Sequence, residues 1–212
     1  MATKTLFEQL REEVEIEPGR SPFFYRRAFR RMTQKYLTQP NRFIREERLD
    51  AKDPEDQRDK NLIRRYPKQG HLFMFEYSSV KENVSVFDPF PLVYCIKFNG
   101  LDFDGCNLHF IHPLKRRIVV ENLQRDKLTL PYNSISKYNM SQIKGLLLDV
   151  AIDEWITAST LPIEDFVSIK EGKPQSISVA EVWKKNNRGF RNMLRGARIY
   201  KGYGTNDSDF KG

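Results

Sequence analysis

The chain has 212 residues, of which 39% are hydrophobic and 12% aromatic, so it can bury a core and global disorder is excluded. Its apolar runs fall short of the roughly 20 residues that a membrane helix needs, and its acidic, amphipathic N-terminus lacks the pattern of a signal peptide. No membrane partner is therefore expected. The net charge of +8 favours a polyanion, or acidic surfaces of other proteins, as partner.

The charge is unevenly distributed along the chain. Residues 1–19 carry a net charge of −3, residues 20–48 carry +7, residues 70–178 carry −2 and residues 179–212 carry +5. These differences favour three regions. We expect an N-terminal helical region with a basic face at 1–63, a central β-rich domain at 64–175, and a C-terminal basic helix with an extended tail at 176–212.

Two helices are predicted in the N-terminal region. Leu6, Leu10 and Val14 lie at helical spacing within the first, which Pro18-Gly19 ends. Ser21-Pro22 is typical of the start of the second, which runs to about residue 37. One face of this second helix carries four arginines: Arg26, Arg27, Arg30 and Arg31. This face either meets an anionic partner or lies solvated while its long side chains cover apolar surface.

The central region is organised around residues 70–111. Three apolar, aromatic and β-branched runs of strand length are separated by turn residues, among them Asn99-Gly100 and Asp104-Gly105. This pattern predicts an α+β protein in which a small antiparallel sheet, or an SH3-like barrel, is flanked by N-terminal helices and a long C-terminal helix.

After residue 111 the pattern becomes mixed. His112-Pro113 begins a predicted helix with an apolar stripe of Leu114, Ile118 and Leu123. Residues 143–150 suggest a short buried helix, and residues 155–169 suggest one or two strands with Pro162 at a bend. Residues 171–175 suggest a loop.

The last predicted helix is capped by Ser176 or Ser178. Its apolar stripe consists of Val179, Trp183, Phe190, Leu194 and Ala197. A basic stripe runs beside it and consists of Lys184, Arg188, Arg191, Arg195 and Arg198. The aperiodic tail that follows is expected to be an extended arm, ordered only against something else.

Catalytic signals are few. His71, His109 and His112 have no nucleophile at a recognisable motif spacing and are interpreted as structural, and Cys95 and Cys106 as buried free thiols. Asp102 and Asp104 are interpreted as turn residues. Asp165, Glu171 and Lys173 resemble the acid–(acid-x-lysine) pattern of metal-dependent nucleases only in composition, because the second acid and the lysine should lie on a strand beside the first acid. We predict no catalytic, cofactor-binding or metal-binding residue.

Four segments of the central region carry a further signal: GHLFMFEYSS, DPFPLVYCIKFNGLDF, GCNLHFIHPLKRRIVVENL and DEWITASTLPIEDF. Together they resemble a family of structural and assembly proteins from T4-like contractile-tailed bacteriophages. The resemblance covers roughly residues 64–169. It rests on Gly70, Asp88, Pro91, Leu92, Val93, Asn107, Leu108, His109, Arg116 or Arg117, Glu154, Trp155, Leu161, Pro162, Glu164 and Phe166. The chain departs from the family pattern at Phe110-Ile111-His112-Pro113 and in its long basic flanks.

The resemblance implies a component of the phage particle, and some members are described as DNA end protectors. The resulting hypothesis is a non-enzymatic virion protein of the tail, baseplate or neck, made in the bacterial host cytoplasm and part of a symmetric multi-subunit assembly. The arginine-rich faces would dock acidic surfaces of other virion proteins. One alternative is a DNA end-binding protein without sequence preference, and another is a metal-dependent nuclease.

Overall fold

The computed structural model describes residues 7, 11–12, 27, 30, 62–79, 86–170, 172–194 and 199–201. Within these residues the protein is a mixture of helices and antiparallel sheet, as the sequence predicts. The strands are β1 (Leu62–Arg64), β2 (Leu72–Tyr77), β3 (Leu92–Phe98), β4 (Asp102–Asn107), β5 (Thr129–Pro131), β6 (Ile135–Asn139), β7 (Ile143–Val150), β8 (Phe166–Lys170), β9 (Lys173–Ile177) and β10 (Ile199–Lys201). The α-helices are α4 (Pro113–Gln124), α5 (Trp155–Thr160) and α6 (Val179–Leu194). Short 3-10 helices are η2 (Leu108–Phe110), η3 (Tyr132–Ser134), η4 (Met140–Gln142) and η5 (Ile152–Glu154).

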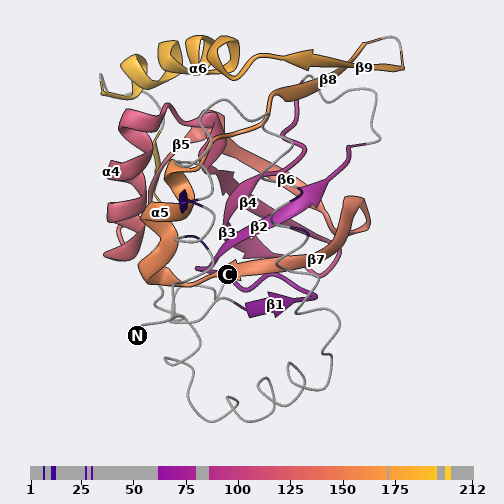
Figure 1. The fold of residues 1–212 in the computed structure, drawn as a ribbon. Coiled ribbons are helices and arrows are strands. Elements are labelled where there is room, and N and C mark those ends of the chain that lie inside the picture. Colours follow the sequence, from indigo (N-terminus) through magenta and orange to yellow (C-terminus); the bar gives the residue numbers. More distant parts are fainter. Residues whose placement is uncertain are drawn as a thin grey trace, which may run out of the picture.

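One sheet of the described strands has the order β1-β7-β2-β3-β4-β6, and every neighbouring pair in it is antiparallel. The remaining strands form the pairs β8–β9 and β10–β5. Figure 1 shows α4 and α5 lying together beside the sheet, while β8, β9 and α6 cross its top. None of the helices described is long and apolar enough to cross a membrane.

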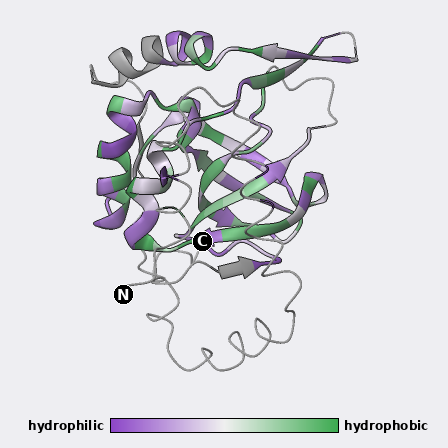
Figure 2. Ribbon diagram, viewed as in Figure 1, coloured by the Kyte–Doolittle hydropathy of each residue, from purple (hydrophilic) through white to green (hydrophobic). Residues whose placement is uncertain are grey.

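Both faces of this sheet are buried, and alternate residues of its strands point to two different cores. On β2, Leu72 and Met74 join a core shared with α4 and α5, whereas Phe73 and Phe75 join a second core. This alternation follows from the two-residue period of a strand. It explains why β2 and β3 are apolar over most of their length, and Figure 2 shows green over much of the sheet, in contrast to the outer side of α4.

The second core lies within the concave side of a strongly curled sheet. Its buried members among the described residues come from β2, β3, β4, β6 and β7, and partly buried Phe87 and Met140 pack against them. The rings of Tyr138 on β6 and Phe75 on β2 lie 5.5 Å apart between centroids, although two strands separate β6 from β2 in the sheet. In a flat sheet these strands would be about 14 Å apart. Register shifts in β2 and in β3 provide local bends of the kind that let a sheet curl.

The two glycine turns predicted around β4 have different outcomes. Asn99-Gly100 is a hairpin turn, as predicted, and Gly100 has a φ of 87° that favours glycine. The prediction of a turn at Asp104-Gly105 is wrong, because both residues pair with β3 and β6 inside β4. Gly105 is required there for space: a Cβ atom would overlap the side chain of Val93 on β3.

Two further expectations after residue 140 are wrong and a third is half right. Residues 143–150 form strand β7, because each side of it pairs with a strand and Leu147 and Leu148 fill opposite cores. Of the one or two strands expected in 155–169, one is present as β8, whereas residues 155–160 form helix α5, despite their β-branched side chains, because Trp155 and Ala158 pack into the core beside α4. The expected loop at 171–175 contains the start of β9, which pairs with β8.

Helix α4 begins where the sequence predicts, but only Leu123 of its predicted apolar stripe is buried. The His112 side chain accepts the Leu114 N–H at 3.3 Å, and Pro113 occupies the first turn. Leu114 is 80% exposed and Ile118 is 58% exposed. The buried side of the helix instead consists of Arg116, Val119, Val120 and Leu123. The sequence pattern failed because a buried arginine takes the place of an apolar residue.

The flanking regions are described only in part. Phe7, Arg11 and Glu12 are helical within the first predicted helix, and Arg27 and Arg30 within the second. Ser178 caps α6 through the N–H of Glu181. The predicted extension of this helix to residue 198 and the tail after residue 201 lie outside the described residues, whereas Ile199–Lys201 pairs with β5.

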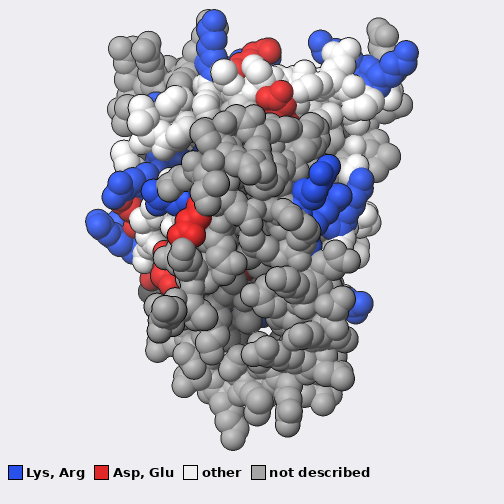
Figure 3. All heavy atoms as spheres, in the orientation of Figure 1, with Lys and Arg blue, Asp and Glu red and all other residues white. Residues whose placement is uncertain are grey.

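The described surface is more positive than the charge of the chain segments suggests. Within residues 70–178, eight of the exposed, described side chains are Lys or Arg and three are Asp or Glu, although this segment sums to a slight negative charge. The difference arises because several acids are buried: Asp88, Asp149, Glu154 and Glu164. Figure 3 shows the resulting Lys and Arg side chains at both sides and along the top of one face.

The packing of β3 against β4 predicts the behaviour of a glycine variant. Gly105→Ala should lower the free energy of unfolding by about 1–3 kcal/mol, because the new Cβ must displace Val93. Chemical denaturation measures this loss. The double variant Val93→Ala/Gly105→Ala should lose less than the sum of the two single variants, by roughly 1 kcal/mol. Strictly additive losses would show that Val93 is not the obstacle.

Candidate functional site

The basic residues predicted to bind partners are only partly described. Arg27 and Lys184 are exposed, and Arg30 is exposed but paired with Glu76. Two residues have a described helical backbone alone: Arg188 and Arg191. Four lie outside the described residues: Arg26, Arg31, Arg195 and Arg198. The structure therefore brings Lys184, Arg188 and Arg191 together on one helix.

The Arg30 guanidinium binds the Glu76 carboxylate of β2 as a fork. Arg30 Nη2 donates to Oε2 at 2.6 Å, and Nε donates to Oε1. The hydrogen bond to Glu76 raises the pKa of Arg30. Because Arg30 is exposed, such a pair contributes little to stability. It nevertheless fixes one arginine of the predicted basic face against the sheet.

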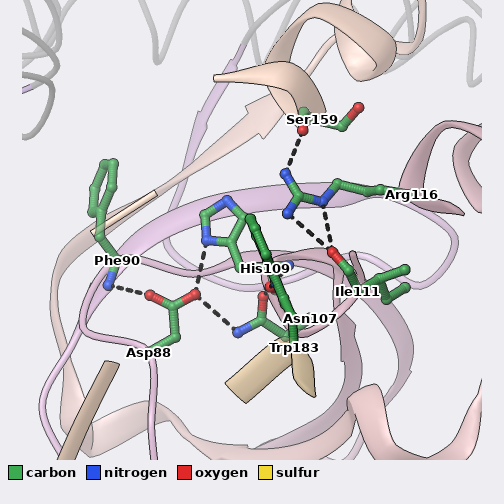
Figure 4. A network of polar contacts seen from close by, with 8 residues as sticks. All are labelled: Asp88, Phe90, Asn107, His109, Ile111, Arg116, Ser159 and Trp183. Carbon is green, nitrogen blue, oxygen red and sulfur yellow. Dashed lines mark hydrogen bonds and ion pairs between the residues drawn. The ribbon is translucent and has the colours of Figure 1, made fainter. Parts of the chain in front are cut away.

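A buried polar network lies where β4 leads into η2, and Figure 4 shows it. Asp88 is at its centre: its carboxylate accepts the Phe90 N–H at 2.9 Å, the Asn107 side-chain amide at 3.1 Å and the His109 Nδ1–H at 2.8 Å. Asn107 in turn accepts the His109 N–H at 2.9 Å. Every polar group named here is inside the protein, so the network fixes the path of the chain from β4 into η2.

Three consecutive backbone carbonyls follow in the chain, those of His109, Phe110 and Ile111, and we call them the carbonyl turn. Each accepts a hydrogen bond from the side chain of a helix. Trp183 Nε1 donates to the His109 oxygen at 2.8 Å, and Asn186 Nδ2 to the Phe110 oxygen at 3.2 Å. The turn therefore holds helix α6 at two successive positions.

Arg116 of α4 binds the third carbonyl of this turn. Its Nη2 and Nε donate to the Ile111 oxygen at 3.0 and 3.3 Å, and its Nη1 donates to the Ser159 oxygen of α5 at 2.5 Å. The side chain is 2% exposed, and its guanidinium lies 5.9 Å from the centre of the Trp183 ring. One arginine thus connects α4, α5, α6 and the turn (Figure 4).

The carbonyl turn sets the position of the basic side of α6. Lys184 directly follows Trp183, and Arg188 and Arg191 follow at steps of four and three residues. The Trp183 ring also lies edge-on to His112, with 5.2 Å between the centroids. Because Trp183 and Asn186 are anchored, the start of α6 has a fixed orientation.

Burial governs ionisation in the network. Desolvation lowers the pKa of His109, although the neighbouring Asp88 opposes this effect. His109 is therefore neutral at pH 7, with its proton on the Nδ1 that faces Asp88. Desolvation also lowers the pKa of Arg116, to about 10, so the guanidinium stays charged at neutral pH.

Two similar contacts tie β1 and the N-terminus to the body. Asp149 of β7 binds His71 Nδ1 at 3.0 Å and Arg64 Nε at 2.5 Å. The Glu154 carboxylate accepts the N–H of Phe7 at 3.2 Å, and the Phe7 side chain is fully buried in the core shared with α4 and α5. The polar residues in these contacts, like those near Asp88, hold chain segments in place.

The structure separates the residues of the nuclease hypothesis. Asp165 precedes β8, whereas Lys173 begins β9 at the other end of the hairpin, about 15 Å away along the ladder. Glu171 lies outside the described residues. Asp165 instead accepts a hydrogen bond from Ser176 at 3.1 Å. The described residues of this set therefore do not converge on one site.

The remaining acids and cysteines that the sequence analysis considered lie on strands of the sheet. The turn expected at Asp102 and Asp104 is wrong for both residues, which lie on β4. Cys95 and Cys106 are buried free thiols, as predicted, and desolvation raises the pKa of each to about 12. Among the residues described, no cluster of three or more His, Cys, Asp or Glu side chains could hold a metal ion.

The sequence missed the donors of the carbonyl turn. The sequence places Trp183 in the apolar stripe of the last helix and does not indicate an acceptor for its indole N–H. Asn186 lies between Lys185 and Arg188, and the sequence pattern does not distinguish it from other polar surface residues. The one available signal was Arg116, which interrupts the apolar positions of α4 three residues after the helix start. The structure resolves the choice between two neighbours: Arg116 is buried, and Arg117 is exposed and pairs with Glu121 at 2.8 Å.

Comparison of the chain with protein-family models, with curated proteins and with solved structures finds no match.

The two neighbouring arginines should respond differently to the same substitution. Arg116→Met should lower the free energy of unfolding by about 3 kcal/mol, because two buried carbonyl oxygens lose their donor. Arg117→Met should change it by less than about 0.5 kcal/mol, because that side chain is exposed. Urea denaturation of both variants measures the difference. Equal losses would contradict the role assigned to Arg116.

The lowered pKa of His109 predicts a loss of stability in acid. Below its ordinary pKa of 6.5 the unfolded chain takes up a proton that the folded protein resists, so unfolding becomes easier as the pH falls. The contribution of one such group approaches about 1.4 kcal/mol per pH unit. Denaturation curves between about pH 7.5 and 5.5 should be less steep in pH for His109→Gln than for the wild type. An unchanged pH dependence in this variant would exclude His109 as the group responsible.

Proposed function

We propose that this chain is a non-enzymatic structural or assembly protein of a contractile-tailed phage particle, at its tail, baseplate or neck. In this proposal it docks neighbouring subunits with acidic surfaces through its basic helices and termini. The observation that carries the proposal is the partition of charge. Fifteen of the exposed, described side chains are Lys or Arg, and only five are Asp or Glu. A surface of this sign attracts acidic partners.

The residues behind the phage resemblance support a scaffold role. Asp88, Asn107 and His109 are buried and bond to one another, and Arg116 bonds to backbone carbonyls. Side chains used in this way maintain a shape. A rigid body with cationic attachments suits a subunit held in a larger symmetric assembly, which would form from protein made in the bacterial host cytoplasm.

The finer fold belongs to the same proposal. We assign the curled sheet to a small SH3-like barrel, supported by the ring contact between β6 and β2 and by a second core whose buried, described members come from strands. We also assign α6, Val179–Leu194, to the predicted long C-terminal helix, and it includes Lys184, Arg188 and Arg191 of the predicted basic stripe.

The alternative is binding to DNA ends without sequence preference, and the same positive surface favours it. Phosphate contacts made by Lys184, Arg188 and Arg191 would give an affinity that falls steeply with salt. The affinity for an acidic protein surface would depend less on salt, because apolar contacts would contribute to the binding as well.

A charge-reversal variant tests both functions. Lys184→Glu/Arg188→Glu/Arg191→Glu should lose binding to purified phage tails in a co-sedimentation assay, by about tenfold or more, because its helix now repels acidic subunits. The matched control Lys97→Glu/Lys144→Glu/Lys170→Glu changes the net charge equally on β3, β7 and β8, and should retain binding.

The same proteins are then mixed with linear duplex DNA at low and moderate salt. The DNA-binding function replaces the assembly function if the wild type binds DNA tightly and in a salt-sensitive way but does not bind tails, and if the α6 variant loses this DNA binding. Failure of the wild type to bind either partner would overturn both. Mass spectrometry of particles separated into heads and tails gives an independent check on location.

A further inference from the structure

Strand β9 has one free edge. Among the described strands it pairs only with β8, and four of its five residues, Lys173 to Ser176, are exposed. Figure 1 shows β9 at the top of the molecule, where it leads into α6. A free edge presents backbone N–H and C=O groups that can pair with a strand of another chain. The residues at this edge therefore decide whether the protein associates through it.

The hydrogen bonds of β8 show which backbone groups of β9 point outward. Val167 of β8 exchanges both of its backbone hydrogen bonds with Phe87, each at 2.8 Å, so its N–H and C=O face away from β9. Val167 lies opposite Ser176, and Ile169 lies opposite Pro174. In an antiparallel pair, opposite residues that exchange hydrogen bonds alternate with opposite residues that do not. The backbone groups of Ser176 and Pro174 therefore point to the outer edge of β9, away from β8.

Pro174 removes an N–H from this outer edge. Proline has no backbone N–H, and the pairing with β8 does not need one here because residue 174 faces outward. Ser176 offers an N–H and a C=O at the edge, whereas Pro174 offers a C=O alone. Among the described residues, no backbone hydrogen bond outside the β8–β9 ladder reaches either of them. The edge is thus exposed, but it lacks one of the donors that a pairing strand needs.

We infer that the outer edge of β9 fits the same edge of a second copy of this chain, and that Pro174 prevents this association. Gln175 is the middle residue of β9, so an antiparallel pairing about Gln175 places residue 174 of one copy opposite Ser176 of the other. Each such pair lacks the hydrogen bond that needs an N–H at residue 174. The strands otherwise match, because Lys173 would lie opposite Ile177 and no like charges would meet.

This inference goes beyond the proposed function and does not depend on it. It concerns the edge of one strand, whereas the proposed function concerns the basic helices and termini. A chain that associates through such an edge can continue to add copies or partly unfolded chains, because strand pairing is the basis of edge-to-edge aggregation. A proline at an outward-facing position blocks this association and leaves the β8–β9 ladder intact.

Hydrogen exchange of the wild-type protein, followed by NMR, tests the orientation of β9 without any variant. The N–H groups of Gln175 and Ile177 face β8 and should exchange slowly. The Ser176 N–H faces solvent and should exchange at least about tenfold faster than either of them. Equal protection of the three groups would show that the edge is covered or that its orientation is different, and would overturn the inference.

Sedimentation velocity tests the role of the proline. Pro174→Thr supplies the missing N–H, so this variant should associate at a protein concentration at least about tenfold below that of the wild type. The matched control Gln175→Thr introduces the same residue at a position that faces β8, and it should sediment like the wild type. If Pro174→Thr associates no more than Gln175→Thr, Pro174 does not block the edge and the inference fails.

A double variant locates the association. Pro174→Thr/Ser176→Pro moves the missing N–H to the other outward position and should return to wild-type behaviour. Ser176→Pro also loses the side-chain hydrogen bond to Asp165, so Pro174→Thr/Ser176→Ala is its control and should associate like Pro174→Thr. Circular dichroism checks that the variants fold, which is expected because the backbone groups of residues 174 and 176 take no part in the β8–β9 ladder. Undiminished association of Pro174→Thr/Ser176→Pro would place the contact elsewhere and overturn the inference.

Discussion

Three consecutive backbone carbonyls, one with a buried hydrogen bond and two with part-buried ones, each bind a helix side chain and so tie helices α4 and α6 to one turn. Two side chains of α6 donate to the first two carbonyls: Trp183 to the His109 oxygen and Asn186 to the Phe110 oxygen. Arg116 of α4 donates to the third, the Ile111 oxygen. A buried carbonyl that lacks a donor costs about 1–3 kcal/mol. Hydrogen bonds therefore hold both helices in place in addition to apolar packing. The Asp88 network serves the same turn from the other side by fixing how the chain enters it.

The second organising feature is the separation of the charges by sign. Acids are used inside, where Asp88, Asp149 and Glu154 accept hydrogen bonds from backbone or from His and Arg side chains. Among the described residues, cations lie mostly at the surface, and Arg116 is the buried exception. A segment that sums to a slight negative charge thus presents a positive surface. The contrast between a neutral β body and cationic helices, which the sequence suggested, gives way to a described surface that is cationic over the body as well.

The elements that the sequence predicted well are those whose signals are local. Gly100 fixes a turn through its positive φ, and His112 with Pro113 fixes a helix start. The elements it missed depend on partners distant in the chain. Residues 143–150 form a strand because β1 and β2 lie on either side of them, and the sequence predicts a turn at Gly105 because its neighbour Val93 is twelve residues away on β3. For the candidate site, the sequence found the basic residues of α6. It could not find their anchors, because a donor such as the Trp183 indole cannot be matched to a carbonyl acceptor 74 residues away before the fold is known.

Leu114 and Ile118, two members of the predicted apolar stripe of α4, lie on the exposed side of the helix. A helix with one apolar side needs one contact, whereas α4 has an apolar side against the core and another toward solvent. Arg116 completes the buried side, and the carbonyl oxygens of Ile111 and Ser159 stabilise its charge. The core therefore forms without Leu114 and Ile118. Arg116 also ties α4 to the turn that holds α6. The outward side of α4 and the start of α6 are thereby fixed relative to each other through one shared set of hydrogen bonds. A partner that contacts both helices would meet a surface arranged before binding, and little conformational entropy would be lost in ordering it.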